Sequence, residues 1–388
     1  MRFLTAGESH GLELTAIIEG LPAGLFLSVD EINLELARRQ VGYGRGGRMK
    51  IEKDRVKITS GVRHGYTLGS PVTLVIENKD WKNWQTVMSP EQVSEKDAPL
   101  RQVTRPRPGH ADLVGGMKYG HRDLRNVLER SSARETAIRV AIGAVCKQLL
   151  KELDVSVAGH VLALGGLRSE LPDNLTVEEI KHRSENSELR VVDSKVEAAM
   201  KELIDQTKKA GDTLGGVVEV LVANVPAGLG SYVHWDEKLD AKIAQAVMSI
   251  NAFKGVQFGL GFTMANLPGS KVMDEITWDG TRGFTRQSDN LGGFEGGMTN
   301  GETIIVQGVM KPIPTLYRPL QSVDIQSKEA YRASVERSDT TAVPAASVIC
   351  ESVVATEIAK AFLTKFSADT CGELKEAVDL YRDRIAQF

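Results

Sequence analysis

Hydrophobic and polar residues alternate along several short runs of the chain, and this period of two predicts β-strands. The clearest runs are Arg55–Thr59, Val72–Ile76, Val217–Val225 and Thr303–Val309. Elsewhere apolar residues recur every three to four positions, which predicts helices over Val29–Arg39, Asn126–Leu153, Asp236–Ala252, Pro344–Phe366 and Glu373–Ile385. Because strands and helices do not alternate regularly, the expected fold class is α+β with antiparallel sheets rather than a doubly wound parallel sheet.

Two segments far apart in the chain resemble one another. Ile17–Leu25 reads as a strand and a Pro-Ala-Gly turn, and a helix with acidic residues near its start follows. Val220–Leu229 has the same order of features. We therefore predict two related halves, approximately 1–210 and 211–388. They are expected to form one domain over the whole chain, because no low-complexity linker divides it.

Charged residues are unevenly distributed over the 388 residues. The chain has 48 Lys or Arg and 51 Asp or Glu, a formal net charge of −3, which is too acidic for a general nucleic-acid binder. Arg38–Arg63 nevertheless holds nine basic and two acidic residues, and Arg101–Arg139 holds nine basic and four acidic ones. Such segregation predicts a focused anion site. The charged stretch Ser169–Gln206 is instead expected to be a solvated excursion between the halves.

The cysteines and the N-terminus argue against further classes of protein. Cys146, Cys350 and Cys371 are odd in number and lack CxxC spacing, so we expect neither a disulfide framework nor a metal site. The first ten residues have no apolar signal core, and no apolar stretch approaches the roughly 18 residues of a membrane helix. We therefore expect a cytoplasmic protein without a membrane or nucleic-acid partner.

The segment Gly42–Gly47 matches the GxGxxG pattern, but we do not expect a Rossmann loop there. That fingerprint needs a strand before it and a helix after it, whereas here a predicted helix precedes it and a strand-like run follows. A basic loop that binds RNA is one interpretation. The other is a clamp whose forked donors bind a phosphate or carboxylate, formed by Arg39, Arg45 and Arg48.

Two loops carry histidines suited to proton transfer. In Gly7–Gly11 a carboxylate, a hydroxyl and the imidazole of His10 share one turn, where glycines permit close approach of a ligand. In Arg105–Asp112 two prolines stiffen a basic loop that holds His110. The alternative is a structural histidine in each case, within loops whose charges are simply solvated.

Four more segments complete the candidate chemistry. Glu129–Glu135 places small hydroxyl residues and two arginines at a helix start, which is either an anion cradle or an ordinary cap. Asp339 precedes the helix that begins near Pro344, and it is either a capping group or a general base. The loops Asn290–Gly301 and Lys311–Thr315 could frame a flat cofactor.

Together, these segments resemble the bacterial, monofunctional type of the chorismate synthase family. The resemblance covers nearly the whole chain and rests on Gly7–Gly11, Gly42–Arg48, Arg105–Asp112, Arg130–Glu135, Gly292–Asn300, Lys311–Leu316 and Arg337–Ala345. It implies a lyase that converts 5-enolpyruvylshikimate 3-phosphate to chorismate and phosphate by 1,4-anti elimination, the last step of the shikimate pathway. It also implies a requirement for reduced FMN and a homotetramer. Each chain would be an internally duplicated β-α-β sandwich, with central helices between two antiparallel sheets.

The resemblance further implies roles for individual residues. His10 would protonate or hydrogen-bond the departing phosphate, His110 would stabilise the reduced flavin, and Asp339 would assist removal of the ring proton. The anionic substrate would be bound by Ser9, Arg45, Arg48, Ser132, Arg134 and Arg337. FMN would contact Arg130, Ser131, Ser132, Asn251, Ala252, Gly296, Lys311, Pro312, Ile313, Pro314, Thr315 and Arg337.

The source of reducing equivalents is a separate question. Arg39 and Arg45 match positions that the family associates with NADP, although a clamp on the substrate explains the same arginines. NADPH would then be an indirect reductant. We expect an external flavin reductase, because the chain shows no extra segment for that activity.

Two other classes of protein share part of this pattern. A nucleic-acid-binding protein would explain Arg38–Arg63, but it would leave the two histidines and Asp339 without a role. A metal-dependent phosphatase would share the phosphate cradle, but it needs a denser set of ligands than Asp112 with His110.

Overall fold

The computed structural model describes residues 1–45, 53–172, 175–336 and 339–388. Its first sheet is antiparallel and has the strand order β1-β2-β6-β3. The strands are β1 (Arg2–Ala6), β2 (Glu13–Glu19), β3 (Val56–Ser60) and β6 (Val72–Glu77). In β2 the buried residues Leu14, Ala16 and Ile18 alternate with less buried ones. One face of this sheet therefore contributes to the core.

The second sheet is also antiparallel and has the order β10-β15-β9-β7-β8. Its strands are β7 (Ser156–Leu164), β8 (Leu167–Arg168), β9 (Gly216–Ala223), β10 (Phe253–Phe258) and β15 (Ile304–Met310). Val157 of β7 belongs to the main core, whereas Ala158 belongs to a smaller core that includes Ile180. Because Ile180 lies in α5 (Val177–Glu185), this helix covers the outer face of β7.

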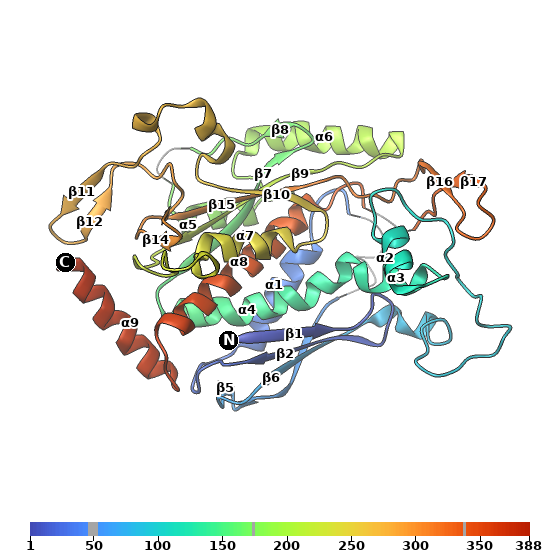
Figure 1. The fold of residues 1–388 in the computed structure, drawn as a ribbon, viewed down its shortest axis with the longest axis horizontal. Coiled ribbons are helices and arrows are strands. Elements are labelled where there is room, and N and C mark those ends of the chain that lie inside the picture. The colour runs from blue at the N-terminus through green and yellow to red at the C-terminus, as the bar shows by residue number, and fades with distance from the viewer. Residues whose placement is uncertain (46–52, 173–174, 337–338) are drawn as a thin grey trace.

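Among the described elements, four helices lie between the two sheets: α1 (Val29–Gln40), α4 (Thr136–Glu152), α7 (Leu239–Met248) and α8 (Val343–Lys365) (Figure 1). Helix α4 packs on β2 and β6, α8 packs on β7 and β9, and the two helices pack on one another. A Cβ atom added at Gly143 of α4 would lie 2.4 Å from the Cβ of Ser352 in α8. Glycine therefore permits the close approach of these two helices.

The other described elements surround this framework. The α-helices are α2 (Asp112–Tyr119), α3 (Arg125–Ser131), α6 (Ser194–Ala210) and α9 (Cys371–Ala386). The 3-10 helices are η2 (Lys79–Asn83), η3 (Ala133–Glu135), η4 (Trp235–Glu237), η5 (Gly261–Asn266) and η6 (Gly269–Lys271). Short hairpins pair β4 (Val62–Arg63) with β5 (Tyr66–Thr67), β11 (Ile276–Asp279) with β12 (Gly283–Arg286), β13 (Phe294–Glu295) with β14 (Met298–Thr299), and β16 (Gln321–Val323) with β17 (Ala330–Arg332).

The predicted α+β class with antiparallel sheets is confirmed. One helix prediction is wrong, because Asn126–Leu153 is not continuous. The backbone leaves the helix at Ser132, whose ψ of 143° is extended and whose side chain accepts from the backbone N–H of Arg134. The break separates α3 from α4. It also brings the hydroxyls of Ser131 and Ser132 to a cavity between the layers.

The expectation for Ser169–Gln206 is also wrong. The stretch contains α5 and most of α6, and Ile180, Met200 and Ile204 are buried within it. Each helix has a narrow apolar stripe that faces the core, and the many charged residues on its solvent side made the sequence look fully exposed. The segment is therefore part of the packed fold.

The two Pro-Ala-Gly segments form the same hydrogen-bonded turn. The hydroxyl of Thr67 accepts from the N–H of Leu25 over 2.9 Å and donates to the carbonyl of Pro22 over 2.6 Å. Thr299 forms the equivalent pair of bonds within 226–229, at 2.9 and 2.7 Å. Each threonine lies on the second strand of a short hairpin, β5 or β14. The likeness of the two segments in sequence thus extends to their local structure.

Among the described helices, none combines the length and the apolar character needed to cross a membrane. The described residues also contain no group of three or more His, Cys, Asp or Glu side chains arranged to hold a metal ion.

Candidate active site

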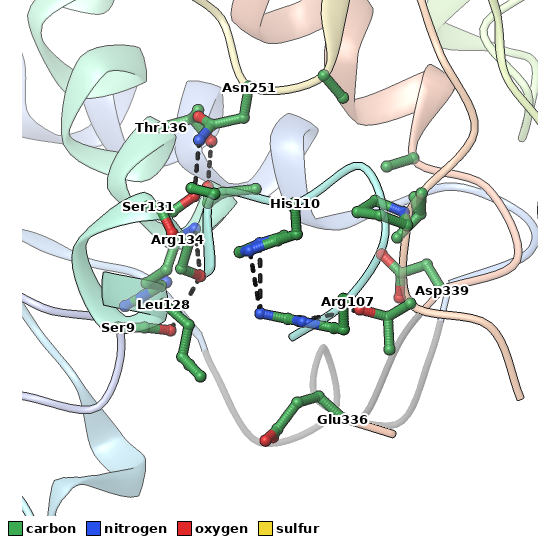
Figure 2. A pocket seen from close by; sticks show the side chains of 18 of the residues that line it. Ser9, Arg107, His110, Leu128, Ser131, Arg134, Thr136, Asn251, Glu336 and Asp339 are labelled. Atoms are coloured by element: carbon green, nitrogen blue, oxygen red, sulfur yellow. Dashed lines mark hydrogen bonds between the residues drawn. The ribbon is translucent and has the colours of Figure 1, made fainter. Parts of the chain in front are cut away.

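A cavity of about 1000 Å³ lies where the starts of α4 and α8 meet a ring of loops. Its walls come from the loop before β2, from η2, from α3, and from the loops that follow α7 and β15. Figure 2 shows His110 and Arg107 beside one another in this cavity, with Ser9 and Arg134 on one side and Asp339 on the other. Segments from nearly the whole chain therefore contribute side chains to one space.

His10 lines the cavity and is held by a residue of α3. Its Nδ1 lies 2.9 Å from Oε1 of Glu129, and its backbone N–H donates to Oε2 over 2.8 Å. The indole of Trp84 stacks on the imidazole, with ring centroids 3.8 Å apart. Burial raises the pKa of Glu129, but hydrogen bonds with His10 outweigh this effect and leave the pKa below its usual value. The buried carboxylate is therefore ionised beside the imidazole.

His110 belongs to a second network around a buried carboxylate. Its Nδ1 lies 2.6 Å from Oδ1 of Asp112, and Nε of Arg107 donates to Oδ2 over 2.9 Å. Another nitrogen of Arg107 donates to the hydroxyl of Thr315 over 2.9 Å. Burial raises the pKa of Asp112, but the hydrogen bonds from His110 and Arg107 outweigh it and hold the pKa well below its usual range. This network joins α2 to the loop after β15.

The cavity has an excess of positive charge. Its described lining residues include seven Arg or Lys and three Asp or Glu. The guanidinium of Arg45 lies 3.2 Å from Oδ2 of Asp339, which links the loop after α1 to the segment before α8. Arg134 lies 2.6 Å from Asp54, and Arg39 lies 3.8 Å from the same carboxylate. Because two arginines share one carboxylate, the surroundings favour an anionic ligand.

Another part of the wall combines polar groups with apolar side chains. The amide of Asn251 donates to the backbone carbonyl of Ser131 over 3.0 Å, and Lys311 donates to the carbonyl of Gly109 over 3.0 Å. The hydroxyl of Ser131 is buried and has no hydrogen-bond partner among the described residues. Such a group suits a ligand that completes its bonding. The apolar lining includes Leu128, Ile250, Ala252, Ala342, Ala345, Ala346 and Ile349.

Most residues named by the sequence resemblance line this cavity. They are Ser9, His10, Arg39, Arg45, His110, Ser131, Ser132, Arg134, Asn251, Ala252, Lys311, Ile313, Pro314, Thr315 and Asp339. Arg48 and Arg337 lie outside the described residues. The fold thus brings together groups that are up to 330 positions apart in the sequence.

Three residues expected at the flavin do not line the cavity. Arg130 is exposed and donates to the carbonyl of Thr5 over 3.0 Å, so its guanidinium is held at the first strand. Pro312 is exposed between two lining residues, because neighbouring side chains of an extended segment point in opposite directions. Gly296 lies on the turn between β13 and β14, where an added Cβ would be 3.8 Å from Tyr232. The described cavity is built without these three.

Two partners of His10 were not predicted from the sequence. Trp84 lines the cavity and stacks on the imidazole, whereas Glu129 is not among the lining residues and binds Nδ1. The only signal in the sequence was the spacing of Arg125 and Glu129, four positions apart at the start of the helix predicted from Asn126, which favours an ion pair. Nothing in that spacing points to a histidine 119 positions away.

The sequence was also compared with known proteins. A sequence model described as chorismate synthase matches residues 1–363. The chain belongs to the chorismate synthase family. It is 74% identical over 382 residues to a chorismate synthase of Enterococcus faecalis, with 98% of each chain covered. It is 64% identical to one of Listeria welshimeri over 388 residues, with both covered in full.

A solved structure supports the same assignment. A crystal structure of chorismate synthase matches this fold with a TM-score of 0.81 and 43% sequence identity, covering 100% of this chain and 98% of that one. The predicted resemblance to the chorismate synthase family is therefore confirmed.

Proposed function

We propose that this protein converts 5-enolpyruvylshikimate 3-phosphate to chorismate and phosphate, the elimination that ends the shikimate pathway. Membership of the chorismate synthase family supports the reaction. The observation that carries the assignment to this chain is the cavity, where His10, Arg45, His110, Arg134 and Asp339 meet from separate segments. These are cationic and proton-carrying groups of the kind that this reaction needs.

Phosphate departure is the step that the cationic groups serve. The bond between ring carbon and phosphate oxygen breaks and its electron pair stays on the oxygen. The pair of a ring C–H bond forms a new double bond, and the existing ring double bond shifts by one position toward the carbon that loses phosphate. Negative charge therefore builds on the phosphate, and positively charged donors already in place stabilise it without reorganisation. For binding the anionic substrate we assign Ser9, Arg45, Arg48, Ser132, Arg134 and Arg337.

Two residues move or hold protons in this proposal. His10 donates from its Nε2 side to the departing phosphate, because Nδ1 already lies 2.9 Å from Glu129. Asp339 assists removal of the ring proton. The guanidinium of Arg45, 3.2 Å from Oδ2 of Asp339, orients that carboxylate. General acid and base groups of this kind contribute about 10²- to 10⁴-fold each.

Reduced FMN is the cofactor that we propose for this cavity. The volume of the cavity, about 1000 Å³, reaches the upper end of the range for a pocket with one ligand, so a flat cofactor and a substrate can share the cavity. The hydroxyl of Ser131 offers an unused hydrogen-bonding group. When bound, reduced FMN supplies transient electron density for phosphate departure, chemistry that side chains do not provide. His110 stabilises the reduced form, and the contacts come from Ser131, Ser132, Asn251, Ala252 and 311–315.

We assign Arg45 to the substrate and give Arg39 a supporting place in the wall of the same cavity, in preference to a nicotinamide site. The guanidinium of Arg39 is buried, and it donates to the hydroxyl of Thr136 over 3.1 Å and to the carbonyl of Ala133 over 2.9 Å. NADPH then acts only as an indirect reductant, through an external flavin reductase. Chorismate formation from FMN and NADPH should accordingly require an added reductase.

We also propose an internally duplicated β-α-β sandwich that forms one domain, with halves of approximately 1–210 and 211–388. The matching turns at Thr67 and Thr299 support the duplication. One core cluster runs from Leu14 to Val378 and supports a single domain. For the assembled protein we propose a homotetramer, whose mass can be measured by light scattering.

An anaerobic assay tests the proposed reaction and cofactor. Purified protein receives 5-enolpyruvylshikimate 3-phosphate with either oxidised FMN or chemically reduced FMN. We expect chorismate only with reduced FMN, without stoichiometric oxidation of the flavin. Absence of chorismate from folded protein that binds flavin would refute the proposal.

A further inference from the structure

One carboxylate accepts two hydrogen bonds from His10. The side chain of Glu129 accepts from the backbone N–H of His10 over 2.8 Å, and its two oxygens lie 2.9 and 3.0 Å from Nδ1. An ionised carboxylate has no hydrogen to donate, so Nδ1 must carry one. Glu129 thereby selects one tautomer of the neutral ring, and Nε2 is the nitrogen left for a ligand in the cavity.

The position of Glu129 is itself secured. Its side chain is 1% exposed, and Arg125 lies 3.3 Å away, one helical turn earlier on α3. The backbone carbonyl of Glu129 accepts from the N–H of Ser9 over 3.0 Å. Main-chain and side-chain bonds therefore join α3 to the loop that carries His10. A shift of the carboxylate would require the helix and the loop to move together.

The plane of the imidazole is held by an aromatic stack. Trp84 lies parallel to it within 22°, and the guanidinium of Arg101 lies 3.9 Å from the indole ring. The indole N–H donates to Oδ2 of Asp80 over 3.1 Å. Glu129 therefore fixes the direction in which the ring nitrogens point within the ring plane, while Trp84 fixes the orientation of that plane.

We propose that Glu129 is a positioning residue for the elimination. It keeps hydrogen on Nδ1 of His10 and presents Nε2 to the cavity, so that the Nε2 proton of the imidazolium passes to the departing phosphate oxygen. After the transfer the neutral ring keeps its Nδ1 hydrogen, and no further group is needed to balance the step. The inference rests on the proposed function, because it gives His10 the role of proton donor.

A second buried pair provides the matched control. His160 on β7 and Glu219 on β9 face one another across the second sheet, with Nε2 3.0 Å from Oε1. Neither residue lines the cavity. Glu219→Gln therefore removes the same charge from a comparable histidine pair, without touching the proposed machinery.

The first measurement is independent of activity. In protein with 15N-labelled histidine, the His10 signals are assigned by their loss in His10→Asn. We expect the neutral ring to carry hydrogen on Nδ1 in the wild type. In Glu129→Gln the amide can donate to Nδ1, so the Nε2–H tautomer should become populated. An unchanged tautomer in Glu129→Gln would overturn the proposal, whether or not the protein makes chorismate.

The second measurement is steady-state kinetics with reduced FMN. For Glu129→Gln we expect kcat to fall at least tenfold with KM within about twofold, because the lost geometry serves a step worth about 10²-fold or more. Glu129→Asp retains the charge and should recover part of kcat. Glu219→Gln should keep kcat within about twofold. An equal loss in Glu219→Gln, or none in Glu129→Gln, would refute the positioning role.

These two measurements also separate this inference from the proposed function. If the wild type makes no chorismate, the proposed function fails, and the tautomer still decides the role of Glu129. If Glu129→Gln does not fold, Glu129→Asp is measured in both assays. Wild-type kcat together with a wild-type tautomer in Glu129→Asp, despite its shorter side chain, would count against the proposal.

Discussion

The substitution Asp112→Asn separates the charge of a buried carboxylate from its shape. Asp112 is fully buried, and its oxygens lie 2.6 Å from Nδ1 of His110 and 2.9 Å from Nε of Arg107. Asparagine keeps the volume but removes the charge, and it places N–H donors where one oxygen accepted. The guanidinium of Arg107 remains buried, with the hydroxyl of Thr315 as a remaining acceptor.

The expected cost follows from leaving that guanidinium without its counter-charge. Breaking a buried ion pair by removing one partner lowers the free energy of unfolding by about 3–5 kcal/mol. We expect Asp112→Asn to lose an amount in this range, measured as a lower Tm and a lower midpoint in urea. Turnover should also fall by about a hundredfold, because His110 is no longer held at Nδ1.

The loss of stability in Asp112→Asn should become smaller as the pH falls. The pKa of Asp112 is lower in the folded protein than in the unfolded chain, so its charge stabilises the fold fully above the unfolded-state pKa of about 3.9. That stabilisation declines as the pH falls toward the folded pKa. The difference in Tm between the wild type and Asp112→Asn should therefore be constant from about pH 5 to 7 and shrink below about pH 4.

A matched pair on the surface provides the control. His234 and Asp236 have the same spacing as His110 and Asp112, and their atoms lie 2.5 Å apart, but both side chains are more than half exposed. Solvent screens such a pair, so Asp236→Asn should leave Tm and turnover unchanged. An Asp112→Asn protein with wild-type Tm, or a difference in Tm as large at pH 3 as at pH 7, would refute the reasoning.

Three further predictions concern other parts of the molecule. His10→Ala and His110→Ala should each lower turnover by about a hundredfold or more, and near wild-type turnover would remove the role of that histidine. Asp339→Asn should slow the chemical step in a single-turnover measurement while flavin still binds. An unchanged single-turnover rate would indicate that Asp339 only caps the helix. Gly143→Ala should lower the free energy of unfolding by about 1–3 kcal/mol, because the added carbon would lie 2.4 Å from Ser352. An unchanged Tm in Gly143→Ala would show that α4 and α8 can separate at little cost.

Among the predicted strands, β15 shows the alternation clearly, whereas β9 was predicted although it has buried residues on both faces, with Val220 in the main core and Leu221 in the smaller one. In β15, buried Ile304 and Val306 alternate with less buried residues, and the pattern of two is visible. No such pattern predicted β7, because Val157 and Val161 lie in the main core while Ala158 lies in the smaller one. A strand buried on both faces reads as a continuous apolar run. The outer face of β7 is covered by α5, whose Ile180 belongs to the smaller core.

Part of the candidate site was predicted from the sequence and part was not. The glycines and prolines around His10 and His110 were enough to predict that these histidines lie in a ligand site. Asp112 stood in the same loop as His110, so its network was within reach of local reasoning. Glu129 and Trp84 were not, because they meet His10 only after α3 and η2 pack against the first loop. Long-range partners of this kind depend on the complete fold.

The two histidines of the cavity show how one arrangement can serve two purposes. Each has a buried carboxylate at Nδ1, but the carboxylates have different neighbours. Asp112 is bound by Arg107 at 2.9 Å, whereas Glu129 accepts from the guanidinium of Arg125 over 3.3 Å. The charge of Asp112 is therefore largely balanced by a permanent cation, while more of the charge of Glu129 faces the imidazole. Environments that differ in this way separate the roles of like groups, and they favour His10 as the proton donor and His110 as the fixed partner of the cofactor.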